Sequence, residues 1–177
     1  MTIRAFAGIQ PRIDASAWVD ESALVIGDVV LDADVSIWPL AVVRGDINSI
    51  RVGARSNIQD GCVLHVTHAG PYSDGGAPLV VGTDLTLGHQ AVLHACSVGN
   101  FCLIGIGSIV LDKAVIGDYV IVGAGSLVPG GKKLESGHLY MGAPARKIRS
   151  LTDAERRMLE YSSGHYVRLK DRHRSGK

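Results

Sequence analysis

Aliphatic residues recur at every sixth position along most of the chain. The longest unbroken series lies in the second half of the sequence: Val98, Ile104, Val110, Ile116, Val122 and Val128. The same spacing relates Leu31, Ile37 and Val43, then Val52, Ile58 and Leu64, then Val81, Leu87 and Leu93. An α-helix cannot produce this period, because its apolar face repeats about every 3.6 residues. The pattern therefore predicts short strands joined by corners.

Three such repeats make one triangular coil of a parallel β-helix. The aliphatic residue points inward, and successive coils stack at the β-sheet spacing of about 4.8 Å. Glycine often follows the aliphatic position, as at Gly53 and Gly82, and we expect it to take the corner. We predict an all-β fold, a parallel β-helix over residues 1–140, with an early partial coil that ends at Ile26.

Two steps are longer than six residues. Val43 to Val52 spans nine residues, and Leu64 to Val81 spans seventeen. The second excess, at about residues 67–78, consists of residues that favour turns. We expect this segment to leave the coil as a loop.

Residues 141–177 predict a linker followed by a C-terminal α-helix. Thr152 and Glu155 form the T-x-x-E capping box that opens a helix, and Gly164 is a point at which it can break or kink. The helix would pack on the β-helix through one apolar face. That face contains Met158, Tyr161, Tyr166 and Leu169.

The charge balance argues against nucleic acid or membrane partners. The 177 residues include 18 Lys and Arg against 17 Asp and Glu, a net charge of +1, so no broad basic surface is expected. The basic stretch at residues 170–177 is typical of a solvated tail. No apolar run approaches a membrane span, and the first residues lack the apolar segment of a signal peptide. We expect a cytoplasmic protein.

The cysteines agree with that assignment. Cys62, Cys96 and Cys102 each stand two residues before an aliphatic position, where the coil needs a small buried side chain. An odd number of cysteines without an export signal indicates free thiols in a reducing compartment.

Two histidines take the position directly after an aliphatic residue of the repeat. His65 follows Leu64 and His94 follows Leu93. They are 29 residues apart, one eighteen-residue coil plus the eleven-residue insertion. We therefore expect them to stack on the same face of adjacent coils. Arg44 takes the same position one coil earlier.

A third histidine, His89, falls on the preceding face and should point elsewhere within one chain. In a threefold assembly, the second face of one subunit can meet the third face of its neighbour. His89 would then join His65 and His94 of another subunit. Three imidazoles leave a fourth tetrahedral position open, as in catalytic zinc sites, where zinc lowers the pKa of bound water toward 7.

Three motifs give the chain a specific resemblance. RGD at 44–46, NIQDGCVLH at 57–65 and GHQAVLH at 88–94 resemble the γ-class carbonic anhydrases and their bacterial hexapeptide-repeat homologues, some labelled ferripyochelin-binding proteins. The likeness extends through MGAPARKI to the C-terminal helix. It implies a left-handed β-helix and a homotrimer with zinc, or ferrous iron or cobalt, bound across each subunit interface. The implied reaction is the reversible hydration of CO2 to bicarbonate.

The resemblance also implies roles for individual residues. His65, His89 and His94 match the metal ligands, and Gln59 matches the residue that hydrogen-bonds the metal-bound hydroxide. Five further residues match polar positions at the interface and around the site, or are candidates to line it. These are Arg44, Asp46 and Asp60, which can form Arg–Asp bridges between subunits, Asn57 and, in the C-terminal helix, Tyr166.

The sequence departs from the family at its proton-transfer positions. The archetypal enzyme carries glutamates in and beside the active-site loop, but here Ile47 follows Asp46. The loop after His65 offers only His68 and Asp74 as candidates to carry the proton released in each turnover. Weak activity, or none in the isolated protein, is compatible with this departure.

Two alternatives remain open. A hexapeptide acyltransferase or thioesterase acting on an acyl thioester would use a single histidine as general base. A non-catalytic metal-binding trimer would keep the site without turnover. The convergence of three histidines with Gln59 and the RGD segment favours the carbonic anhydrase interpretation.

Overall fold

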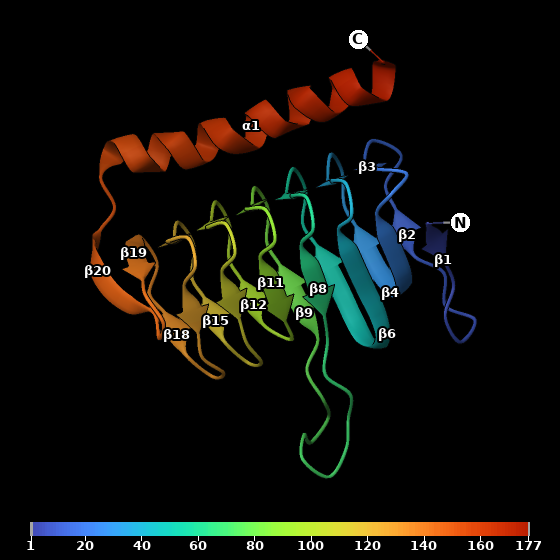
Figure 1. Cartoon of the computed structure of the whole chain (residues 1–177), viewed down its shortest axis with the longest axis horizontal. Helices are drawn as coiled ribbons and strands as arrows, with labels where there is room; N and C mark the ends of the chain where they lie inside the picture. Colours follow the sequence, from blue (N-terminus) through green and yellow to red (C-terminus); the bar gives the residue numbers. More distant parts are fainter. Residues whose placement is uncertain (1, 177) are drawn as a thin grey trace.

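The computed structural model describes residues 2–176, which form a three-sided left-handed parallel β-helix with one α-helix along its side (Figure 1). One loop projects from the β-helix on the side away from this helix (Figure 1). The fold class is therefore the one that the sequence and its family resemblance predict.

Each side is a stack of parallel strands, called face one, face two and face three in the order of the chain. Face one contains β2 (Arg12–Ile13), the end of β4 (Leu24–Leu31), the end of β6 (Val42–Val52), β9 (Leu79–Val81), β12 (Ser97–Val98), β15 (Val115–Ile116) and β18 (Lys133–Leu134). Face two contains β3 (Trp18–Val19), β5 (Ser36–Ile37), β7 (Asn57–Ile58), β10 (Thr86–Leu87), β13 (Leu103–Ile104), β16 (Ile121–Val122) and β19 (His138–Met141), to which β20 (Arg146–Ser150) adds antiparallel. Face three contains β1 (Ile3–Arg4), the starts of β4 and β6, β8 (Val63–His65), β11 (Val92–His94), β14 (Ile109–Val110) and β17 (Leu127–Val128).

The aliphatic positions of the repeat form the core, as predicted. They pair in register from coil to coil: Val43 aligns with Leu64, and Leu64 with Leu93. Apart from Ile26, every one of the predicted inward positions is at most 4% exposed. The stack of these side chains is the main source of stability, because each buried aliphatic side chain contributes roughly 1.5–3 kcal/mol.

The β-helix begins earlier than predicted. Ile26 is not an inward position of the repeat, because Val25 is the residue that aligns with Val43 and is fully buried. The six-residue spacing then continues back through Val19 to Ile13. The first coil was missed because Ile26 is also aliphatic and shifts the count by one.

The glycine that follows the aliphatic position does not take the corner, contrary to expectation. Positive φ angles fall two residues after Gly53 and Gly82, at Arg55 and Asp84. A Cβ on Gly53 would lie only 2.6 Å from the backbone of Gly82 in the next coil. Glycine is needed here because adjacent backbones approach too closely for any side chain.

The two long steps are accommodated differently. Between Val43 and Val52 the extra residues stay within β6, which turns the corner as one strand with a register shift opposite Gly27 and Val29 of β4. Residues 66–78 leave the coil as the projecting loop, closed by isolated antiparallel bridges (Figure 1). The predicted loop is confirmed.

The C-terminal helix, α1 (Asp153–Ser175), is continuous over 23 residues. Thr152 is its N-cap and forms the predicted capping box with Glu155. The helix runs through Gly164 without interruption. No helix in residues 2–176 is both long enough and apolar enough to span a membrane.

The packing face of α1 differs from the predicted one. Of the residues expected there, Met158 and Tyr161 are exposed. Tyr166 and Leu169 are partly buried. The fully buried positions are Leu159, Ser163 and Lys170. The hydrophobic pattern of the sequence does not predict this packing face, because a serine and an ion-paired lysine occupy two of its three buried positions.

The C-terminal half of α1 is fastened to the first coils. Lys170 is 1% exposed, and its Nζ lies 2.9 Å from a carboxylate oxygen of Asp34. The ring of His173 packs against Trp38 and Trp18, with centroids 5.1 Å and 5.5 Å away. Face two is therefore covered from its last coil to its first, as Figure 1 shows.

The cysteines are buried and unpaired, as predicted. Burial raises the pKa of each thiol to about 12 in Cys62, Cys96 and Cys102. Thiolate chemistry at neutral pH is thus disfavoured, and the three side chains serve as small core residues.

A buried ion pair at one corner yields a stability prediction. Arg55 donates to both carboxylate oxygens of Asp84, at 2.8 and 2.6 Å, and Asp84 is only 3% exposed. Arg55→Ala should lower the free energy of unfolding at pH 7 by about 2 kcal/mol, less than for a fully buried pair because Arg55 is half exposed. Urea denaturation measures this loss, with exposed Arg157→Ala as the matched control.

The same pair predicts a pH dependence. Burial alone would raise the pKa of Asp84, but hydrogen bonds from Arg55, Thr83 and Ser163 outweigh it and lower that pKa. A lowered folded-state pKa stabilises the protein above the unfolded-state value, near 3.9, and the gain is lost as the pH falls through the folded value. The difference between wild type and Arg55→Ala should therefore shrink in acid. An equal difference at pH 7 and pH 3 would contradict this assignment.

Candidate metal centre

His65 and His94 meet on face three, as the spacing predicts. They end β8 and β11 and align directly in the parallel register. His65 Nδ1 and His94 Nε2 face each other at 3.1 Å. Two nitrogens bound to one tetrahedral zinc at 2.0–2.1 Å would be about 3.3 Å apart. The spacing of this pair therefore suits a shared metal ion.

The second nitrogen of each of these rings is held by a carboxylate. His65 Nε2 lies 3.2 Å from Asp46, and His94 Nδ1 lies 2.6 Å from Asp112. Metal-binding histidines commonly have such a partner, which fixes the ring and its tautomer. Burial lowers the pKa of His65, which favours the neutral ring that a metal requires.

Arg44 belongs to the same group. Its Nη1 lies 2.5 Å from Asp46, so its acidic partner is in its own chain. Burial alone would raise the pKa of Asp46, but hydrogen bonds from Arg44 and His65 outweigh it and lower that pKa. Arg44 thus keeps Asp46 ionised, and the Asp46 carboxylate in turn holds the ring of His65. A bridge from Arg44 across a subunit interface stays a prediction.

Asp112 was missed in the sequence. Burial alone would raise its pKa, but hydrogen bonds from Thr67 and His94 outweigh it and lower that pKa. Asp112 comes eighteen residues after His94, which is one coil, so a search for acids at that spacing would have found it. The threonine begins the projecting loop and ties its base to the site.

His89 stands at the corner between face two and face three, with a different set of neighbours. Its Nδ1 lies 2.9 Å from Asp60, and both side chains are nearly half exposed. Its Nε2 is left for another partner. His89 therefore shares with His65 and His94 the arrangement of one ring nitrogen held by a carboxylate and the other directed away from it.

Gln59 lines a cavity together with His89, and Asn57 lies in β7 on face two. Gln59 is 4% exposed, and its Nε2 donates to Asn57 Oδ1 at 3.1 Å. Asn57 in turn donates to Thr86 at 3.1 Å. This chain of hydrogen bonds fixes the Gln59 amide, so that its oxygen remains available as an acceptor.

Tyr166 of α1 closes this side of the site. Its ring packs edge-on against Trp38, with centroids 5.8 Å apart. Burial raises the pKa of Tyr166, Asp60 adds to the rise, and a hydrogen bond with Gln59 opposes it. Tyr166 therefore serves both helix packing and the polar group around Gln59.

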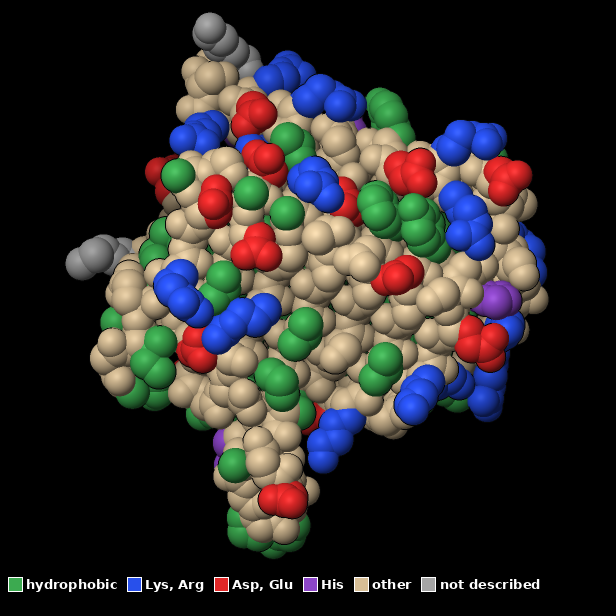
Figure 2. Space-filling view, turned by 180° about the vertical axis from the view of Figure 1, so that it is seen from behind, with side chains coloured by type: hydrophobic (Ala, Val, Ile, Leu, Met, Phe, Trp, Pro, Cys, Tyr) green, Lys and Arg blue, Asp and Glu red, His purple; other side chains and the backbone are tan. Residues whose placement is uncertain are grey.

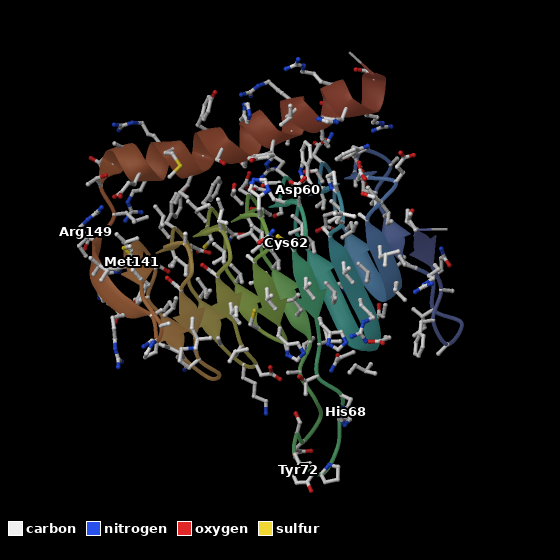
Figure 3. All side chains as sticks on the ribbon, viewed as in Figure 1. Asp60, Cys62, His68, Tyr72, Met141 and Arg149 are labelled. Carbon is white, nitrogen blue, oxygen red and sulfur yellow. The ribbon has the colours of Figure 1, made fainter. Side chains whose placement is uncertain are left out.

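Within one chain, the predicted site residues form two separate half-sites. Asp60, the partner of His89, lies beneath α1, whereas His68 lies on the projecting loop at the opposite side (Figure 3). In residues 2–176, no group of three His, Cys, Asp or Glu side chains is arranged to hold a metal. Within the described residues, His89 is therefore not grouped with His65 and His94.

The two proton-shuttle candidates differ in position. His68 is exposed and borders a cavity of about 320 Å³ that also contacts Thr67 and Asp112. Asp74 is exposed farther along the loop and does not border that cavity. Of the two, His68 is the one near the half-site of His94.

Comparison with known proteins agrees with this architecture. Residues 95–130 match the bacterial transferase hexapeptide family, a model of six repeats. Protein YrdA of Escherichia coli K12 is 53% identical over 96% of this chain and 92% of its own length. Mitochondrial gamma carbonic anhydrase 1 of Arabidopsis thaliana is 40% identical over 92% of this chain, which spans 59% of that protein.

A solved structure shows the same fold over nearly the whole chain. It is a Bacillus cereus protein described as a candidate acetyltransferase, with 38% identity and a TM-score of 0.92. The match covers 99% of this chain and 98% of that one. The chain belongs to the γ-carbonic anhydrase-like family of hexapeptide-repeat proteins.

Proposed function

We propose that the protein is a zinc-dependent enzyme of the γ-carbonic anhydrase type, which hydrates CO2 reversibly to bicarbonate as a homotrimer. One observation carries this proposal. His65, His89 and His94 each have one ring nitrogen held by a carboxylate and the other directed away from it. This is the arrangement of metal-ligating histidines, and three of them leave a coordination position for a reactant.

The outer surface of face three supports a trimer. Its outward row is aliphatic in five successive coils, at Val42, Val63, Val92, Ile109 and Leu127. Val63 and Ile109 are 38% and 39% exposed, and α1 covers face two instead. Such an aliphatic row fits burial against other copies. The rear view, which presents face one instead, shows charged side chains among the hydrophobic ones (Figure 2).

The position of this row explains how the half-sites would meet. One edge of face three carries His65 and His94, and the other edge adjoins the corner with His89. When three copies turn face three toward a common axis, each edge meets the opposite edge of a neighbour. Every interface then contains one complete set of three histidines.

The surrounding residues would each have a defined task. Bound zinc, with Fe²⁺ or Co²⁺ as the other candidates, would make a water-derived nucleophile available at neutral pH. Gln59, held by Asn57, would orient the attacking oxygen toward the carbon of CO2. Arg44 and Asp46 would hold the ring of His65. His68 would accept protons at the base of the loop.

The decisive experiment combines three measurements on anaerobically purified protein. Sedimentation should give a trimer, elemental analysis about one metal per chain, and stopped-flow assays CO2 hydration that chelators abolish and zinc restores. A stable monomer that keeps one tightly bound metal per chain would refute the shared site. A metal-loaded trimer without hydration would point to the non-catalytic alternative.

Acyl transfer is the second candidate function. It is favoured by the 38% identity to the Bacillus cereus protein described as a candidate acetyltransferase. In that case a single histidine would act as general base, and activity with an acyl thioester would persist after metal removal.

We assign the protein to the cytoplasm, since its buried cysteines are unpaired.

A further inference from the structure

A cavity of about 430 Å³ extends from Gln59 and His89 along face two. It runs beneath Tyr166 of α1 across two further coils. CO2 does not need a space of this size, which falls within the range of small-molecule pockets. The cavity can therefore hold a ligand larger than CO2.

The two ends of the cavity differ chemically. Gln59, Thr86 and His89 stand at one end, and the other is lined by aliphatic side chains. These are Leu103, Ile106, Ile121, Val122 and Ala124. Among the described residues that line the cavity, none is Asp, Glu, Lys or Arg. The far end thus suits an uncharged chain and not a nucleotide or a sugar phosphate.

The wall formed by α1 is fixed in place. Thr86 and Ser162 are joined by a hydrogen bond of 3.0 Å, which links β10 to α1 beside the cavity. Ile106 is 56% exposed, although it is a large aliphatic residue facing this space. A ligand in the cavity would cover it.

We propose that this cavity binds the acyl chain of a carboxylic compound, with the carboxyl carbon beside Gln59 and His89. The inference rests on the proposed function, because it places the carboxyl group at the proposed site and assigns that site a substrate class beyond CO2. The occupant is a linear, uncharged acyl chain of about six to eight carbons, since the apolar lining spans two coils about 4.8 Å apart beyond His89.

Calorimetric titration of the metal-free trimer with butanoate, hexanoate and octanoate tests the proposal. Each buried methylene should raise the affinity about fourfold, so octanoate should bind far more tightly than butanoate. Ile106→Asn and Ala124→Phe should each weaken octanoate binding at least tenfold, because one adds a polar group and the other fills the space. Both positions are exposed, so folding should be unaffected.

Leu40→Asn is the matched control. Leu40 is 69% exposed at the same series of corners but does not line the cavity, so this variant should bind octanoate like the wild type. Equal affinity for all chain lengths, or normal octanoate binding by Ile106→Asn, would overturn the proposal. Failure of every chain length to bind, as would follow if side chains of a neighbouring copy fill the cavity, would overturn it as well. Metal content is measured separately, so loss of the metal site and loss of acyl binding are distinguishable.

Discussion

His94→Ala should bring metal content and CO2 hydration to background together. The substitution removes one of two ring nitrogens that face each other at 3.1 Å on face three, and among the described residues His89 is not grouped with them. The proposed trimer should persist, because the aliphatic row of face three is unchanged. Elemental analysis, stopped-flow hydration and sedimentation on one preparation check the three parts.

Mixing two inactive variants tests whether the site is shared between subunits. His89→Ala and His94→Ala damage opposite half-sites, so a trimer containing both kinds of chain keeps one undamaged interface. Co-expression with random assembly should restore metal to about a quarter of the wild-type content, because three quarters of the trimers are mixed. No recovery in verified mixed trimers would mean that all ligands come from one chain.

Gln59→Ala should separate chemistry from metal binding. An amide is a poor zinc ligand and a good hydrogen-bond partner, so metal content and the trimer should be retained. Loss of the group that orients the attacking oxygen should lower kcat roughly ten- to a thousandfold. Stopped-flow hydration with metal-normalised enzyme measures this loss.

The matched control is Gln10→Ala, which removes an exposed glutamine from the first coil and should leave the rate unchanged. Asn57→Ala should reproduce part of the Gln59→Ala loss, because Asn57 fixes the Gln59 amide through the bond of 3.1 Å. Full activity of Gln59→Ala in an enzyme that requires its metal would disprove the orienting role.

The register of the half-site on face three could be predicted by counting alone. The insertion between Leu64 and Val81 is a whole loop added to a regular coil, so His65 and His94 remain in line. A β-helix makes sequence distance a direct measure of position, which is uncommon among folds. The inward aliphatic positions were predictable for the same reason.

Other features depend on contacts that no period encodes. The burial of Lys170 follows from its pairing with Asp34, which is distant in the sequence. The role of Gly53 follows from the close approach of Gly82, and not from its own backbone conformation. Asp112 stands two residues after the inward Val110, so the pattern that marks His65 and His94, directly after an inward residue, does not mark it.

The course of α1 has a consequence for how the molecule unfolds. In a solenoid each coil contacts only its neighbours, so the end coils can open independently of the rest. Here Leu159 packs with Ile121 near the last coils, while His173 contacts Trp18 in the first. The helix thereby links the two ends of the stack, and opening of the first coil is energetically coupled to detachment of a helix anchored at the last. The single helix α1 thus gives the stack of coils an unfolding cooperativity that a linear array of coils lacks.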